Sequence, residues 1–187
     1  MERYEVKLSG SGGQGLILAG LILAEAAALY DGKNAVHTQS YGPESRGGSS
    51  SSIVIISDEV IDYPKATKID VLLSLTQESV NKYSSDIKDG GILIVDAESV
   101  KDIPAGNFKI YKLPVISTAR KEVGKVIVAN IVALGLIAAL IGTVSIDAIK
   151  KALFARIPKG TEELNFKALE AGINLVKEAQ FSLDPKL

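Results

Sequence analysis

The chain has 187 residues, 47% of them hydrophobic and 23% charged, which is ordinary for a globular α/β domain with a substantial core. Its formal net charge of -1 predicts no broad electrostatic attraction to nucleic acid or to an anionic membrane. Because there is no cysteine and His37 is the only histidine, the sequence excludes disulfides, thiolate-ligated iron–sulfur clusters, multi-histidine metal sites and nucleophile pairs that need a second imidazole.

The first predicted elements are a strand, a glycine-rich turn and a helix. Polar and apolar residues alternate over residues 4–8, which predicts a half-exposed strand. After the glycines, residues 16–29 are apolar and alanine-rich, a composition that favours a helix. Turn residues at 31–34 end this helix. No apolar signal segment precedes the strand, so we expect a cytoplasmic protein.

Strands dominate the middle of the chain. Apolar and β-branched runs predict them at residues 35–39, 51–57, 71–75, 91–96 and 108–112. A Gly/Ser-rich loop, 40–52, follows the first of these runs. A short helix is predicted over residues 76–83, with Thr76 as its N-cap.

The C-terminal part is predicted to be helical from Val115 onward, with breaks at 142–143 and 157–160. Ser145 and Thr161 are the predicted N-caps of the last two helices, and 181–187 is a predicted frayed tail. With no repeat and no long linker, residues 1–187 are predicted to form one domain. The expected fold class is α/β, a three-layer α/β/α domain with a largely parallel sheet and a helical C-terminus.

An uncharged run from 126 to 146 is long enough to span a bilayer. It contains Asn130, two glycines and two hydroxyl residues, and it is the only such run, so we interpret it as a buried core helix. We therefore expect no membrane contact. Self-association or partner contact through this helix is an alternative to simple burial.

The glycine turn satisfies the spacing G-x-G-x-x-G between a strand and a helix. Its residues are Gly10, Ser11, Gly12, Gly13, Gln14 and Gly15. Glycines there permit a tight turn, and the free N–H groups of the helix start favour an anion such as phosphate. The second strand has no carboxylate until Glu44, so nicotinamide binding is not expected, and no Walker A lysine follows the glycines. A turn that only packs helix against sheet remains an alternative.

The loop after the second strand is the other candidate site. It comprises Ser40, Tyr41, Gly42, Pro43, Glu44, Ser45, Arg46, Gly47 and Gly48. If the first two strands are neighbours, this loop faces Gly12 and Gln14, and Arg46 could pair with a carboxylate or phosphate. A surface contact between Glu44 and Arg46 is the simpler alternative. We expect His37 to be a hydrogen-bonded residue within or beside the sheet.

Several segments resemble, in family order, the gamma subunit of the thiamine-diphosphate-dependent 2-oxoacid:ferredoxin oxidoreductases. They are GSGGQG at 10–15, TQSYGPESRGG at 38–48, IDYP at 61–64, GG at 90–91 before IVD at 94–96, and NIVALG at 130–135. The second segment is the most specific. The IDYP stretch is more similar to the 2-oxoglutarate branch than to the pyruvate or branched-chain branches.

The resemblance implies that this chain is one part of a larger enzyme. Thiamine diphosphate and magnesium would sit between alpha and beta subunits, and iron–sulfur clusters would be held by cysteines of other subunits, with a ferredoxin-like delta subunit as a further candidate partner. The assembled enzyme would convert 2-oxoglutarate, coenzyme A and oxidised ferredoxin to succinyl-CoA, carbon dioxide and reduced ferredoxin. On its own the chain would hold no cofactor or metal and supply no catalytic residue. The glycine turn and the 40–48 loop would then position the 2-oxoacid or coenzyme A, or only dock partner subunits.

Three other interpretations stay open. One is the beta subunit of indolepyruvate ferredoxin oxidoreductase, which shares the glycine turn. Another is a free-standing anion- or nucleotide-binding domain, which predicts ligand binding by the isolated chain. The third is a purely structural assembly protein, for which variants of the loop would alter complex formation but not kinetics.

Overall fold

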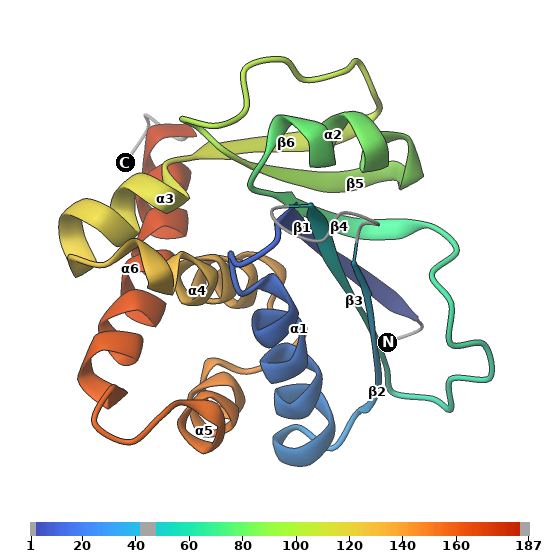
Figure 1. The fold of residues 1–187 in the computed structure, drawn as a ribbon. Helices are drawn as coiled ribbons and strands as arrows, with labels where there is room; N and C mark the ends of the chain where they lie inside the picture. Colours follow the sequence, from blue (N-terminus) through green and yellow to red (C-terminus); the bar gives the residue numbers. More distant parts are fainter. Residues whose placement is uncertain (1–2, 42–47, 184–187) are drawn as a thin grey trace.

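The computed structural model describes residues 3–41 and 48–183, with side chains described to residue 179 (Figure 1). The predicted glycine turn, the helical C-terminus and the strands all appear at the expected places. The strands are β1 (Tyr4–Ser11), β2 (Asn34–Tyr41), β3 (Ser49–Ser57), β4 (Ile69–Ser74), β5 (Ile87–Asp96) and β6 (Phe108–Leu113).

The six strands form one sheet in the order β2-β3-β1-β4-β5-β6. Pairs β1–β4, β4–β5 and β5–β6 are parallel, whereas β3 is antiparallel to both of its neighbours, β1 and β2. Only β3 therefore runs against the other strands, and the predicted largely parallel sheet is confirmed. The first two strands are not neighbours, because β3 lies between β1 and β2.

The helices vary in length and regularity. They are α1 (Leu16–Glu25) with the π-helical turn η1 (Ala26–Tyr30), α2 (Gln77–Tyr83) with η2 (Ser84–Asp86), α3 (Val115–Thr118) with η3 (Ala119–Val123), η4 (Val126–Val128), α4 (Ala129–Ile141), α5 (Ile146–Arg156) and α6 (Glu162–Leu183). α6 runs past residue 181, where the sequence predicted fraying to begin, and residues 184–187 lie outside the described part.

The sheet has helices on both faces, but the two outer layers are unequal. Figure 1 shows α1, α4, α5 and α6 on one side and the short α2 on the other. Strand side chains alternate between the two faces. Val6 and Leu8 join the large helical core, whereas Leu72 and Leu93 join a smaller core beneath α2. The three-layer α/β/α class is confirmed.

The uncharged 126–146 run is not one continuous helix. A 3-10 turn precedes α4, and Gly142, with a φ of 61°, ends it. Residues 130–138 of α4 are all buried, so the predicted core helix is confirmed for this part, while Ile127 is 71% exposed. Among the described residues, no helix is long and apolar enough to cross a membrane.

Two glycines bring α4 and α6 into backbone contact. A Cβ at Gly135 would stand 2.1 Å from the carbonyl oxygen of Leu169, and one at Gly172 would stand 2.0 Å from that of Val132. Such distances leave no room for any side chain at either position. The glycine of the NIVALG segment thus fixes how closely the two longest C-terminal helices approach.

The predicted caps mostly act as expected. Thr76 Oγ1 accepts a hydrogen bond from Ser79 N, and Ser145 Oγ accepts one from Ala148 N. Thr161 stands just before α6, as predicted, but its hydroxyl accepts from the side-chain amide of Asn165 instead of a backbone N–H.

Candidate functional site

The glycine turn joins the carboxyl end of β1 to the start of α1. Gln14 N donates to Ser11 O at 3.3 Å, and Gln14 Oε1 accepts from Ser11 N at 2.7 Å. These two hydrogen bonds close the turn on itself. A Cβ at Gly10 would stand 2.2 Å from Gln14 Oε1, so the glycine at this position is needed for the side-chain bond to form.

Gly15 is the N-cap of α1 and has a φ of 74°, a left-handed conformation that glycine adopts at no steric cost. Its carbonyl accepts from Ala19 N, the first helical hydrogen bond, and from Asn130 Nδ2 at 3.1 Å. A Cβ at Gly15 would stand 2.6 Å from the same Nδ2 atom. Asn130 therefore holds the turn from α4, a role that the sequence analysis missed.

The two ends of the 40–48 loop are described, and one of them contacts the glycine turn. Ser40 and Tyr41 are exposed at the end of β2, and Tyr41 is 67% exposed. Gly48, which leads into β3, accepts a hydrogen bond of 2.6 Å through its carbonyl from Gly12 N. The other predicted site residues of this loop lie outside the described residues; they are Gly42, Pro43, Glu44, Arg46 and Gly47.

The N-terminus of α1 can accept an anion. Its first-turn N–H groups have no partner within the helix, no side chain caps Gly15, and the first turn has no acidic residue. Gly13, with a φ of 88°, is exposed, and no described atom lies within 4 Å of where its Cβ would stand. The backbone at Gly13 is thus open to a ligand or to a partner protein.

An apolar cavity of about 300 Å³ adjoins the turn. Leu18 of α1, Ile127 of η4 and Leu164 of α6 contribute to its wall, together with Gly13 and Gly15. Ile127 and Leu18 are 71% and 37% exposed. An unpaired helix start beside exposed apolar side chains suits a protein interface or an anionic ligand with an apolar arm.

His37 lies on β2, as a hydrogen-bonded residue of the sheet. Its Nε2 lies 2.8 Å from Ser52 Oγ on β3, and burial lowers the pKa of the imidazole below 6.5, although the charge of Glu25 opposes this. A Cβ at Gly20 of α1 would stand 1.9 Å from Ser52 Oγ. The histidine thus sits where α1 packs most closely on the sheet, and its expected structural placement is confirmed.

The geometry disfavours a nicotinamide site. In a dinucleotide-binding fold, the second strand lies beside the first and ends in an acidic residue. Here β2 has no acidic residue, and β3 separates it from β1. Among the described residues, no three His, Cys, Asp or Glu side chains gather to hold a metal ion.

Comparisons with known proteins agree on one family. The model of the pyruvate ferredoxin/flavodoxin oxidoreductase family matches residues 5–175. A 2-oxoglutarate synthase subunit KorC from Methanocaldococcus jannaschii is 51% identical over 178 residues, 94% of this chain and 95% of that one. The gamma subunit of a keto/oxoacid ferredoxin oxidoreductase from Geobacter sulfurreducens is 52% identical, with a TM-score of 0.89 over 96% of this chain and 99% of that one.

A more distant relative is longer. Ketoisovalerate oxidoreductase subunit VorA from Methanothermobacter thermautotrophicus is 36% identical over 178 residues. The match covers 92% of this chain but 36% of VorA. In that relative, the counterpart of the present chain is therefore joined to further sequence within one polypeptide.

Proposed function

The chain belongs to the pyruvate ferredoxin/flavodoxin oxidoreductase family, and we propose that it is the gamma-type subunit of a cytoplasmic 2-oxoglutarate:ferredoxin oxidoreductase. The observation that carries this proposal is the 51% identity to a 2-oxoglutarate synthase subunit over nearly all of both chains, against 36% to the ketoisovalerate subunit. The assembled enzyme converts 2-oxoglutarate, coenzyme A and oxidised ferredoxin to succinyl-CoA, carbon dioxide and reduced ferredoxin.

The chemistry of the reaction belongs to other subunits. Iron–sulfur clusters need thiolate ligands, and this chain has no cysteine. A magnesium-held thiamine diphosphate needs a set of oxygen ligands, and no group of three acidic or histidine side chains forms among residues 3–41 and 48–183. The proposal therefore assigns both groups to partner subunits.

The partners in this proposal are alpha and beta subunits and a ferredoxin-like delta subunit. The length of VorA supports such contacts, because a counterpart of this chain is there linked covalently to a larger unit. The exposed apolar residues beside the glycine turn, Ile127 and Leu18, supply the surface that an interface core requires.

The proposal assigns the glycine turn and the 40–48 loop to that interface. In support, Gly12 of the turn and Gly48, the last residue of the loop, are hydrogen-bonded at the carboxyl edge of the sheet, where the start of α1 offers unpaired N–H groups. In one version of the proposal, this edge helps to position the 2-oxoacid or coenzyme A, both of which carry negative charge. In the other version, it only docks the catalytic subunits.

Purification of the tagged chain from its native cytoplasm tests the assignment. We expect cysteine-rich and thiamine-binding subunits to co-purify, with reduction of a viologen dye that requires both 2-oxoglutarate and coenzyme A. Activity with pyruvate, a branched-chain 2-oxoacid or indolepyruvate in place of 2-oxoglutarate would overturn the substrate but keep the family. The absence of partners and of activity, with nucleotide binding by the chain alone, would favour a free-standing domain.

A pair of glycine variants tests the role of the turn. Gly13→Asn places a side chain in open space at the turn, and asparagine tolerates the left-handed conformation there. Gly32→Asn is the control, because Gly32 has a φ of 65°, an equally open position, and lies beyond the other end of the same helix.

Three results separate the versions. If the turn positions a substrate, Gly13→Asn raises the Michaelis constant for 2-oxoglutarate or coenzyme A in the assembled enzyme, and Arg46→Ala does the same. If the turn only docks partners, Gly13→Asn weakens assembly and leaves the constants of the remaining complex unchanged. If Gly13→Asn and Gly32→Asn have the same Michaelis constants and the same assembly, the turn neither positions a substrate nor docks a partner.

A further inference from the structure

A second pocket lies on the sheet face opposite α1, toward the amino ends of the parallel strands. Its volume is about 500 Å³, within the range of small-molecule sites. Residues 64–67 form one wall, and the face of β1, β3 and β2 contributes Lys7, Ile53 and Thr38. Asp86 of η2 lines the opposite side. Nothing in the proposed function uses this pocket.

Lys7 is the most unusual residue of the pocket, because it is charged yet only 7% exposed. Its Nζ lies 3.4 Å from the centre of the Tyr83 ring and 3.9 Å from Asp86 Oδ2. The second distance is too long for a hydrogen bond. No described residue accepts a hydrogen bond from Nζ, so the N–H donors that do not face the Tyr83 ring are available to a ligand in the pocket.

The charged residues that line the pocket favour an anion. They are Lys7, Lys65 and Asp86, two cations against one carboxylate. Burial lowers the pKa of Lys7, Asp86 raises it, and Lys82 on α2 lowers it. An anion bound here would relieve the cost of burying the Lys7 ammonium without a hydrogen-bond acceptor.

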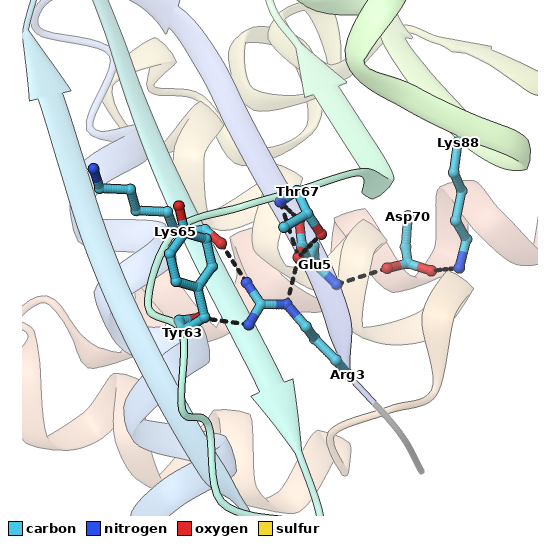
Figure 2. Close-up of polar contacts among 7 residues, drawn as sticks. All are labelled: Arg3, Glu5, Tyr63, Lys65, Thr67, Asp70 and Lys88. Atoms are coloured by element: carbon cyan, nitrogen blue, oxygen red, sulfur yellow. Dashed lines mark hydrogen bonds and ion pairs between the residues drawn. The ribbon is translucent and has the colours of Figure 1, made fainter.

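The wall formed by residues 64–67 is held in place by hydrogen bonds and ion pairs around two buried carboxylates, Glu5 and Asp70. Figure 2 shows the guanidinium of Arg3 between Glu5 and the loop. Arg3 donates to Glu5 Oε1 and to the carbonyl oxygen of Tyr63, each at 2.5 Å, and to that of Lys65. Glu5, 2% exposed, accepts from Thr67 N at 2.9 Å and from Thr67 Oγ1 at 3.1 Å.

The network continues to the neighbouring strands. Glu5 N donates to Asp70 Oδ2 at 2.8 Å, and the other carboxylate oxygen of Asp70 pairs with Lys88, as Figure 2 shows. Only the two carboxylates, Glu5 and Asp70, are buried, and removing the cation from either would leave a buried charge uncompensated. The loop that carries the IDYP segment is therefore held in one position over the sheet, so the pocket exists before any ligand arrives.

The pocket is separate from the glycine turn. Lys7 precedes Ser11 by four residues on β1, which places the two about 13 Å apart along the strand. The side chain of Lys7 also points to the face of α2, whereas α1 starts on the other face. A ligand on Lys7 would therefore occupy a site of its own.

We propose that this pocket is a second binding site, for a small molecule that carries a carboxylate or phosphate group, with the Lys7 ammonium as its anchor. Lys65 and Thr38 line the same pocket and would contact the rest of the ligand. The hydrogen bonds that Arg3 and Glu5 make to residues 63, 65 and 67, here called the Arg3–Glu5 clamp, hold the 64–67 wall in place beside the pocket. The site is independent of the proposed function, because it needs neither the glycine turn nor a partner subunit.

The test is calorimetric titration of the full chain with inorganic phosphate and, separately, with succinate. We expect one of the two to bind at a single saturable site, which also identifies the anionic group that the pocket prefers. Lys7→Met keeps most of the apolar stem and removes the charge, and it should weaken binding by about tenfold or more. Lys65→Met, at an exposed position, should weaken it in the same direction. Lys167→Met, on the exposed side of α6, is the matched control and should leave binding unchanged.

Three results would overturn the proposal. One is no saturable binding of either probe to the folded chain. Another is an affinity for the probe that is the same in Lys7→Met and Lys65→Met as in the control Lys167→Met. The third is a Lys7→Met chain that loses partner subunits while neither probe binds, which would mean that the pocket receives an acidic side chain of a partner. If Lys7→Met does not fold, the Lys65→Met variant decides between these outcomes.

Discussion

The side-chain amide of Asn130 donates a hydrogen bond of 3.1 Å to the carbonyl of Gly15, a residue 115 positions earlier in the chain. This contact ties α4, the central helix of the core, to the start of α1. It joins two segments, GSGGQG and NIVALG, that look unrelated in the sequence. The shape of the glycine turn thus depends on a polar side chain in an otherwise apolar helix.

Asn130→Ala should destabilise the fold by about 1–2 kcal/mol, because the Gly15 carbonyl loses the donor that Asn130 supplies and the missing amide leaves a gap. Urea denaturation of the purified chain measures the change in free energy of unfolding. Asn174→Ala, at an exposed position of α6, is the control and should change stability little.

A double-mutant cycle tests the same contact from the other side. Gly15→Ala should cost about 1–2 kcal/mol in backbone strain, with a further cost because the new Cβ meets Asn130 Nδ2 at 2.6 Å. In the Asn130→Ala background most of that clash is gone, so Gly15→Ala should cost less there. Strict additivity of the two substitutions would contradict the contact.

At the glycines between α4 and α6, whether a Gly→Ala substitution raises or lowers stability shows how tightly the two helices are packed. Alanine has the higher helix propensity, by about 1 kcal/mol, so an exposed Gly→Ala change would stabilise a helix. At Gly135 and Gly172, however, the Cβ would stand 2.1 and 2.0 Å from backbone oxygens. We expect each alanine variant to lose about 1–3 kcal/mol in urea denaturation. A gain in stability would show that the helices separate without cost.

His37 should make stability depend on pH. Burial lowers its pKa in the folded state below the ordinary 6.5, so the unfolded chain takes up the proton at a higher pH than the folded chain. The stability associated with neutral His37 is fully present above pH 6.5 and is lost as the pH falls below 6.5 toward the folded pKa.

Because the chain has one histidine, His37→Gln isolates this effect. Urea denaturation from about pH 7.5 down to about pH 5 should show a smaller loss of stability in the variant than in the parent chain. Identical pH profiles would mean that His37 titrates alike in both states.

The clamp on the 64–67 segment predicts a local effect. Glu5→Gln removes the charge that Arg3 and Thr67 share, so hydrogen exchange at the Thr67 amide should speed up by about tenfold or more. Lys33→Met breaks an exposed ion pair with Asp58 and should leave Thr67 unchanged. An unchanged rate in Glu5→Gln would mean that other contacts hold the loop.

The strands and helices could be predicted from the sequence because β-branched runs, glycine turns and caps are local signals. The neighbour of β1 could not be predicted from those signals alone. The connection between Tyr41 and Ser49 is too short for a parallel crossover, which needs about a dozen residues or more. That length indicates a hairpin of β2 and β3, which is the pairing that the structure has.

The candidate site was predicted in part. Gly10 and Gly15 follow from the motif, but Asn130 acts across 115 residues, and only its polarity within an apolar run could have marked it. The buried Lys7 and the Arg3–Glu5 clamp carry no motif. They depend on which face of β1 each side chain occupies and on the path of the loop before β4.

The proposed function makes this chain a required part of a 2-oxoglutarate:ferredoxin oxidoreductase. To test this, the purified complex is compared with the same complex assembled without this chain, and both are assayed for viologen reduction that depends on 2-oxoglutarate and coenzyme A. We expect the activity to be lost without the chain and to return when the purified chain is added back. Full activity without the chain, or restored activity only with a different 2-oxoacid, would contradict the proposed function.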